Sequence, residues 1–218
     1  MSEEPTRILF IRHATNDYVK TGRLAGRTPE VHLNGVGRTQ ALAVAGRLAS
    51  LPIAALYSSP LERAAETALP IAQSHDISVT SLDGLAETDC GTWTGRLITD
   101  LAQSEEWRIM QSAPSRTRHP GGESALEVQW RMVSVVELLL ARHVAQTIAI
   151  VSHADPIRLL LAHYIGLHVD MFQRLAVDPA SISEIEFCPS KPRLLRCNDC
   201  GHLNEAEGTK EVVSGSGK

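Results

Sequence analysis

The first residues whose types suggest chemistry are Arg12 and His13, which directly follow the apolar run of residues 8–11. A histidine at the end of a strand is more often structural than nucleophilic. The adjacent arginine changes this balance, because burying a guanidinium beside an imidazole is unfavourable unless an anion neutralises both. Phosphate is the anion that best fits the forked donors of arginine. The pair therefore indicates a phosphate-binding site.

Two further basic side chains follow other predicted strands. Arg63 comes shortly after the apolar run of residues 53–57, and His153 comes directly after the buried run of residues 147–151. In sheets of parallel strands, ligands bind beyond the carboxyl ends of the strands. We therefore expect Arg63 and His153 to meet Arg12 and His13 at one edge of the sheet.

The elements that must position these side chains alternate along the chain, with short apolar runs separated by segments of helical periodicity. This alternation predicts a single three-layer α/β domain, with a mostly parallel central sheet flanked by helices and an antiparallel edge. The predicted strands are residues 7–12, 53–57, 77–80, 147–151, 182–187 and 194–197, the last two being the antiparallel candidates.

Local signals predict where the helices begin. Asn34 is a capping residue, Pro60 opens a helix that runs to about residue 75, and Pro156 opens another. Ser124 and Glu127 form a capping box for a long helix that ends near residue 143. Residues 15–33 and 81–96 are predicted loops, and residues 97–118 are predicted to hold one or two short helices.

Length and charge limit the classes of function. The chain has 218 residues and a net charge of -4, which favours one domain and gives no general attraction to nucleic acid or membrane. We predict a domain over residues 1–204 and a flexible tail over residues 205–218. Residues 1–6 are polar and no run of about 20 apolar residues is present, so we expect a cytoplasmic protein.

The four cysteines are candidate metal ligands. Cys197 and Cys200 form a lone CxxC pair, and only Cys188 and His202 lie near them in the sequence. Structural zinc sites usually take four ligands from two such pairs. We therefore interpret the thiols as incidental and predict no metal and no cofactor.

Five segments, in order, resemble the histidine phosphatase superfamily, which includes the cofactor-dependent phosphoglycerate mutases. Arg12-His13-Ala14 is similar to the Arg-His-Gly signature of that family. The other segments are residues 56–68 (LYSSPLERAAETA), residues 85–87 (LAE) with Gly91, Trp93 and Gly95, residues 120–124 (PGGES) and residues 151–153 (VSH). The resemblance covers roughly residues 7–203. A two-residue match alone carries no weight, whereas several motifs in the family's order are specific.

The resemblance implies a role for each matching residue. His13 is expected to attack phosphorus through one ring nitrogen while the other donates to the backbone. Arg12, Arg63 and His153 are expected to hold the phosphate oxygens, as a metal ion does elsewhere. Glu87 is expected to protonate the leaving oxygen and then activate water, which requires a raised pKa or a proton delivered with the substrate.

Some positions depart from the family pattern. Ala14 replaces the usual glycine, Asn16 stands where serine or threonine is common, and Val19 stands where an asparagine normally touches phosphate. Asn16 is therefore either a phosphate ligand or a plain turn residue. Arg23 and Arg27 in the long loop are either solvated charges or substrate-recognition residues.

The resulting hypothesis is a metal-independent phosphatase that acts on a small-molecule phosphomonoester through a phosphohistidine. A phosphoglycerate mutase is the alternative. We favour the phosphatase because residues 88–93 lack the arginine and tyrosine that typically follow the mutase glutamate, and because residues 97–118 are short for the mutase insertion. A non-catalytic phosphate-binding module is disfavoured because His13 and Glu87 are both present. Substrate identity and oligomeric state do not follow from the sequence.

Overall fold

A computed structural model describes residues 4–188 and 191–203, and within them six strands form one sheet. The strands are β1 (Thr6–Arg12), β2 (Ile53–Ser58), β3 (Val79–Ser81), β4 (Thr147–Ser152), β5 (Ile182–Phe187) and β6 (Pro192–Asp199). The α-helices are α1 (Asp17–Lys20), α2 (Gly35–Leu48), α3 (Glu62–His75), α4 (Ile98–Leu101), α5 (Glu105–Ser112), α6 (Ala125–Arg142) and α7 (Ala154–Ile165). Short 3₁₀ helices are η1 (Asp83–Leu85), η2 (Gly91–Trp93), η3 (Pro114–Arg116) and η4 (Val169–Arg174).

The order of the strands brings the ends of distant segments together. The sheet order is β3-β2-β4-β1-β5-β6, in which β4 lies between β2 and β1. The pairs β1–β4, β2–β4 and β2–β3 are parallel, while β5 and β6 run antiparallel at one edge, as predicted. Arg12 pairs in register with Ser152. Because of this register, His13 and His153 leave neighbouring strands at the same level.

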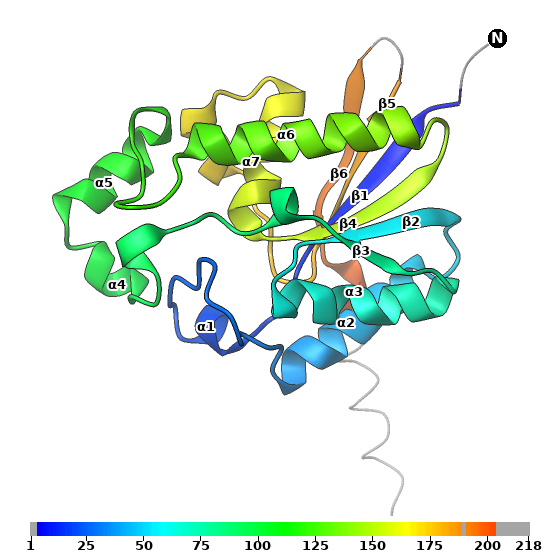
Figure 1. The fold of residues 1–218 in the computed structure, drawn as a ribbon, viewed down its shortest axis with the longest axis horizontal. Helices are drawn as coiled ribbons and strands as arrows, with labels where there is room; N and C mark the ends of the chain where they lie inside the picture. The colour runs from blue at the N-terminus through cyan, green and yellow to red at the C-terminus, as the bar shows by residue number, and fades with distance from the viewer. Residues whose placement is uncertain (1–3, 189–190, 204–218) are drawn as a thin grey trace, which may run out of the picture.

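Helices cover both faces of the sheet, which confirms the three-layer prediction. Side chains of a strand alternate between faces, so Ile8 and Phe10 pack under α6 and α7, while Leu9 and Ile11 pack against α2 and α3. Figure 1 shows α6 and α7 above the sheet and α2 and α3 below it. Strand β1 contributes side chains to both apolar cores, so packing on both faces holds the strand that precedes His13.

The predicted helix starts at Asn34 and Ser124 are confirmed, while the other two are shifted by two residues. The Asn34 side chain accepts from Gly37 N, and Ser124 with Glu127 forms the predicted capping box. Helix α3 begins at Glu62, two residues after Pro60. The reason is local: the Ser59 hydroxyl accepts from the Leu61 amide at 3.3 Å, so residues 59–61 form a turn outside the helix. Helix α7 begins at Ala154, with His153 as its cap, and Pro156 lies inside its first turn, where proline is tolerated.

The third strand is also shifted from its prediction at residues 77–80. Asp76 adopts a left-handed backbone with φ of 53° at the end of α3. The Ile77 amide then bonds to the Ala72 carbonyl at 3.1 Å, which completes the helix end. Ile77 is therefore committed to the helix cap, and β3 pairs with β2 only from Val79 onward.

A group of short helices lies beyond the carboxyl ends of β1 and β4. The predicted loop of residues 15–33 contains α1, and the predicted short helices of residues 97–118 are α4 and α5. Figure 1 shows α1, α4 and α5 together at one end of the molecule. Trp93, Leu101 and Met110 form a small apolar cluster of their own there, against which Trp107 packs. This cluster packs η2, α4 and α5 against one another.

Other sequence expectations concern segments away from the sheet edge. The predicted tail of residues 205–218 lies outside the described residues. Among the described helices, none is long and apolar enough to cross a membrane. The four cysteines are free thiols, and no cluster of three histidine, cysteine or acidic side chains within the described residues is arranged to hold a metal ion.

Candidate active site

His13 lies at the carboxyl end of β1 with only 3% of its surface exposed. Its backbone amide donates to the Ser152 carbonyl at 2.9 Å, which continues the β1–β4 pairing one residue further. Its Nδ1 lies 2.8 Å from the Ala14 carbonyl oxygen. A carbonyl only accepts, so Nδ1 carries the hydrogen and Nε2 keeps its lone pair. Burial, and then the charges of Arg12 and Arg63, holds the pKa of His13 well below its ordinary value.

His153 follows β4 and packs against His13 with the ring centroids 5.0 Å apart. It is completely buried, and its Nε2 lies 2.7 Å from the hydroxyl of Ser59, the residue after β2. Burial and then the charge of His13 holds the pKa of His153 well below its ordinary value. Three strand ends thus meet at one point, as the sheet order requires.

Two guanidiniums stand beside this pair. Arg63 in the first turn of α3 is completely buried, and its Nη2 donates to the Gly26 carbonyl at 2.7 Å. Arg12 donates from Nη1 to the Val177 carbonyl at 2.7 Å. Each guanidinium is therefore fixed at one nitrogen by a backbone carbonyl. Burial is the largest influence on both groups and lowers the pKa of each from its ordinary value.

The remaining donors of these groups are buried without a protein partner. Among the described residues, Arg12 Nε, Arg63 Nε, Arg63 Nη1 and His153 Nδ1 make no hydrogen bond. A buried unsatisfied donor costs about 1–3 kcal/mol, and more when the group is charged. Four such donors around one imidazole are therefore a strong indication of an anion-binding site.

Thr67 holds the turn after His13 against the helix that carries Arg63. Its hydroxyl accepts from the Ala14 amide at 3.0 Å and donates to the Arg63 carbonyl at 2.7 Å. Our sequence reasoning did not single out Thr67, although it lies within the motif of residues 56–68. Its position four residues after Arg63, one turn along the same helix, was the available signal.

Glu87 lies just after η1 with its carboxyl group close to His153. Its Oε2 is 3.8 Å from His153 Nδ1, and its Oε1 accepts from the Thr88 amide at 2.8 Å. Burial and then the charge of Asp155 raise the pKa of Glu87 to about 7, against the opposing charge of Arg63. A carboxyl group with this pKa can hold or release a proton at neutral pH.

A cavity of about 470 Å³ opens onto these groups. Arg12, His13, Arg63 and Glu87 line it, while His153 is buried with its ring against His13 and its Nδ1 on the side of Glu87. The structure therefore brings together all five residues that the sequence predicted to act on phosphate. The cavity is larger than a phosphate group, so its outer part can hold the rest of a substrate.

The three residues predicted to recognise substrate are placed differently. Asn16 lines the cavity and is buried; its Oδ1 accepts from Val19 N at 2.9 Å, and its Nδ2 has no partner among the described residues. Arg23 lines the cavity, is exposed, and donates to the Gly95 carbonyl at 2.9 Å. Arg27 is not among the cavity-lining residues and forms an ion pair with Glu123 at 3.0 Å.

The outer wall of the cavity includes residues that were not among the predicted site residues. Trp107, Met110 and Phe172 supply apolar surface. Asp155 and Arg158 of α7 also line the cavity and pair with each other at 3.0 Å. Their position two and five residues after His153, on the helix that follows β4, was the available signal.

Known proteins resemble this chain in sequence and in fold. The sequence profile of the histidine phosphatase superfamily (branch 1) matches residues 8–200. Phosphoserine phosphatase 1 of Hydrogenobacter thermophilus is 31% identical over 201 residues, which span 91% of this chain and 95% of that protein. A probable phosphoglycerate mutase, GpmB, of Proteus mirabilis is 31% identical, with 83% of this chain and 85% of that protein covered. A phosphoserine phosphatase variant from Entamoeba histolytica in complex with phosphoserine has a TM-score of 0.82 and 26% identity, covering 91% of this chain and 99% of that one.

Proposed function

The chain belongs to the histidine phosphatase superfamily, and we propose that it hydrolyses a phosphomonoester through a phosphohistidine formed on His13. One observation carries this proposal. The free Nε2 of a buried, neutral imidazole lies among guanidinium and imidazole donors that have no partner among the described residues. Such donors match the non-bridging oxygens of a phosphate group, which spread its charge in the transition state.

In the first step, the Nε2 lone pair attacks phosphorus and the ester P–O bond breaks. Arg12 and Arg63 donate to the non-bridging oxygens. Ser59 donates its hydroxyl hydrogen to His153 Nε2, so that Nδ1 of His153 carries the hydrogen that faces the phosphate. Glu87 gives its proton to the departing oxygen, and the products are an alcohol and phosphohistidine.

In the second step, the Glu87 carboxylate takes a proton from water while the water oxygen attacks phosphorus. The P–N bond breaks, its electrons return to His13 Nε2, and inorganic phosphate leaves. Glu87 ends the cycle protonated again. A pKa of about 7 suits both steps, because the same carboxyl group must first release and then accept a proton.

The substrate class is a small phosphomonoester whose alcohol part occupies the outer cavity. Phosphoserine is the first compound to test, because two of the similar proteins are named phosphoserine phosphatases. The Asp155–Arg158 pair at the cavity wall presents one negative and one positive group, which is a suitable arrangement for an amino acid. The apolar wall of Trp107 and Met110 leaves room for a larger alcohol.

The mutase alternative rests on the similarity to a probable phosphoglycerate mutase. A mutase must retain a substrate that carries a second anionic group. At the cavity wall, Arg158 shares its charge with Asp155, and Arg23 is exposed to solvent. These cations are poorly placed to hold a second phosphate against water, which favours hydrolysis.

The deciding experiment measures phosphate release from phosphoserine, an aryl phosphate and 3-phosphoglycerate, the last with and without a bisphosphate primer. We expect free phosphate, activity that survives a chelator, and acid-labile phosphate on the wild-type chain after rapid quenching. Release from none of these esters, with no labelled protein, would refute the proposal. Conversion of 3-phosphoglycerate to its isomer without net phosphate release would establish the mutase.

A further inference from the structure

The proposed mechanism leaves open what holds Glu87 in place, because this residue lies in a loop. Its backbone carbonyl accepts two hydrogen bonds from guanidiniums. Arg27 donates from Nε at 2.9 Å, and Arg131 donates from Nη2 at 3.1 Å. Arg27 belongs to the loop before α2, and Arg131 belongs to α6. Two segments that are distant in sequence thus converge on the backbone of one residue.

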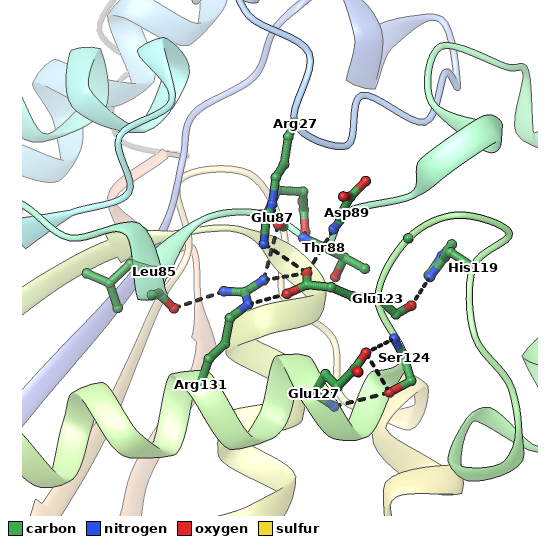
Figure 2. A network of polar contacts seen from close by, with 12 residues as sticks. Arg27, Leu85, Glu87, Thr88, Asp89, His119, Glu123, Ser124, Glu127 and Arg131 are labelled. Carbon is green, nitrogen blue, oxygen red and sulfur yellow. Dashed lines mark hydrogen bonds and ion pairs between the residues drawn. The ribbon is translucent and has the colours of Figure 1, made fainter.

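Glu123 binds both of these guanidiniums, as Figure 2 shows. Its Oε2 lies 3.0 Å from Arg27 Nη2 and 3.1 Å from Arg131 Nη2, and its Oε1 lies 2.9 Å from Arg131 Nε. The amide of Asp89, two residues after Glu87, donates to Oε2 at 2.9 Å. Only 20% of the Glu123 side chain is exposed. This carboxylate therefore joins both guanidiniums to residues 86–90, the loop that carries Glu87, which we call the acid loop.

Glu123 is ionised in this setting. Burial alone raises the pKa of Glu123, but the hydrogen bonds from Arg131 and the Asp89 amide, with the charge of Arg27, hold that pKa below its ordinary value. The ionised group neutralises one of the two positive charges that meet at the Glu87 carbonyl. Without it, two guanidiniums beside the acid loop would favour the ionised form of Glu87.

The backbone around Glu123 also pairs with the acid loop. The Glu123 amide donates to the Asp89 carbonyl at 2.9 Å. This approach is close enough that a Cβ on Gly122 would lie 2.2 Å from the Asp89 oxygen. The Glu123 side chain is therefore placed by a backbone contact that only glycine allows, and it cannot drift from the loop without breaking that contact.

The same network reaches the phosphate pocket through Arg27. Gly26, the preceding residue, provides the carbonyl that accepts from Arg63 Nη2 at 2.7 Å. Gly26 is buried with φ of 48°, and a Cβ there would lie 3.0 Å from the Thr94 hydroxyl. Fixing Arg27 to Glu123 thus also fixes the carbonyl that orients Arg63.

We propose that Glu123 is a positioning residue for catalysis, which holds Arg27 and Arg131 on the Glu87 carbonyl and so keeps the proton donor in register with the phosphate ligand Arg63. This inference rests on the proposed role of Glu87. It assigns Arg27 to the support of the site rather than to direct contact with substrate.

The test compares Glu123→Gln with Glu127→Gln as the matched control. Glu127 lies four residues further on, caps the same helix with Ser124 and does not contact the acid loop; glutamine also serves in a capping box. For each variant, kcat and kcat/KM are measured from pH 5 to 9 with 4-nitrophenyl phosphate, whose leaving group needs little protonation, and with glycerol 2-phosphate, an alkyl ester. The comparison of the two esters uses kcat/KM, which reports the step that releases the alcohol. Thermal unfolding is recorded in parallel.

We expect Glu123→Gln to lower kcat/KM for the alkyl ester by about 10², the loss that a displacement of about 1 Å can cause. The aryl ester should change far less. On the alkaline side of the pH profile, activity should begin to fall at a lower pH than in the wild type, because the guanidinium charge that Glu123 no longer cancels favours the ionised form of Glu87. Glu127→Gln should match the wild type for both esters and at every pH.

Removing a positive charge instead of a negative one provides a second, independent check. Arg27→Met removes one positive charge and one donor to the Glu87 carbonyl, so its loss of activity should begin at higher pH than in the wild type. The double variant Arg27→Met/Glu123→Gln restores the charge balance, so the pH at which its activity begins to fall should return toward that of the wild type. Arg27 is partly exposed, so Arg27→Met remains informative if Glu123→Gln fails to fold.

Equal losses for both esters with an unmoved pH profile would show that Glu123 serves only the fold, and would overturn the inference. Wild-type behaviour of Glu123→Gln would also overturn it. A raised KM with unchanged kcat in Arg27→Met would instead place Arg27 on the substrate. If the wild-type chain hydrolyses neither ester nor any compound of the wider panel, the proposed function itself fails, which is a different result.

Discussion

Replacing Glu87 with glutamine isolates the contribution of one proton to the reaction. Burial and then Asp155 raise the pKa of Glu87 to about 7, from an ordinary value of 4.5. At pH 6, a carboxyl group of pKa 7 is roughly 90% protonated, whereas one of pKa 4.5 is roughly 3% protonated. The site thus increases the fraction of Glu87 that can act as an acid by about 30-fold at that pH.

The assay measures kcat/KM for 4-nitrophenyl phosphate and glycerol 2-phosphate from pH 5 to 9. In the wild type, hydrolysis of the alkyl ester should fall about tenfold per pH unit above pH 7, because ionised Glu87 cannot donate a proton. In Glu87→Gln, the alkyl ester should lose about 10² to 10⁴ in rate, the usual contribution of a general acid. The aryl ester should lose much less, and the limb above pH 7 should disappear.

Two results would refute this reasoning. Equal losses for the aryl and alkyl esters would mean that Glu87 does not protonate the leaving oxygen. A wild-type limb that begins near pH 4.5 would mean that burial does not hold the proton on Glu87. Glu127→Gln is the control, since this exposed carboxylate caps α6 away from the cavity.

Four further perturbations address the nucleophile, the phosphate ligand and the acid loop. His13→Ala should abolish turnover and leave no acid-labile phosphate after quenching; labelled protein in this variant would place the nucleophile elsewhere. Arg63→Met should lower kcat by about 10³ or more, by analogy with other arginines in phosphoryl transfer. Its melting temperature should not fall, because the substitution removes a buried charge that has two nitrogens without a hydrogen-bond partner. A marked fall in its melting temperature would contradict that account. Orthovanadate at 100 times its Kd should stabilise the wild type by about 2.7 kcal/mol, and a calorimetric shift of the same size in Arg63→Met would show that Arg63 does not hold the anion. In a denaturant titration, Gly122→Ala should lower the free energy of unfolding by about 1–3 kcal/mol, because the added Cβ overpacks against the Asp89 carbonyl. Gly46→Ala is the control: a Cβ there meets nothing within 4 Å, so the free energy of unfolding should be unchanged or higher.

Much of the fold could be predicted because its signals are local. The apolar run before Arg12 and the run before His153 are strands whatever surrounds them, and the Ser124 capping box marks a helix start by itself. Since parallel strands end at one edge, the meeting of the two histidines followed from the element order. Their register, which puts Arg12 opposite Ser152, had to come from the structure.

Boundaries were missed where one backbone group had two possible partners. The Ile77 amide completes the end of α3 rather than joining β3, and the Leu61 amide bonds to Ser59 rather than entering α3. Secondary-structure propensity cannot decide between two hydrogen-bond partners of one backbone amide, because either partner satisfies that amide. The difference lies in tertiary packing, which a sequence pattern does not contain.

The support of the acid loop was not predictable from sequence for a different reason. Arg27, Glu123 and Arg131 each have the pattern of a solvated charge, and Arg27 is separated from the other two by about half of the chain. Gly122 lets the backbone that carries Glu123 approach the Asp89 carbonyl, a contact that the charge pattern does not indicate. The sequence left Arg27 open between a solvated charge and a substrate-recognition residue, because its charge is evident from the sequence but its partner is not.

Glu87 and Glu123 show how one site can set two identical side chains to opposite tasks. The pKa of Glu87 is raised to about 7 by burial and by Asp155, while the pKa of Glu123 is lowered by its hydrogen bonds to Arg131 and the Asp89 amide, although burial opposes this. Arg27 and Arg131 bind the carbonyl of Glu87 but direct their charge to the carboxylate of Glu123. Had either arginine paired with the Glu87 carboxyl group instead, that group would be ionised at neutral pH and could not act as an acid. The guanidiniums can therefore fix the position of Glu87, the proposed proton donor, without favouring the loss of its proton, and this separation is what the proposed role of Glu123 requires.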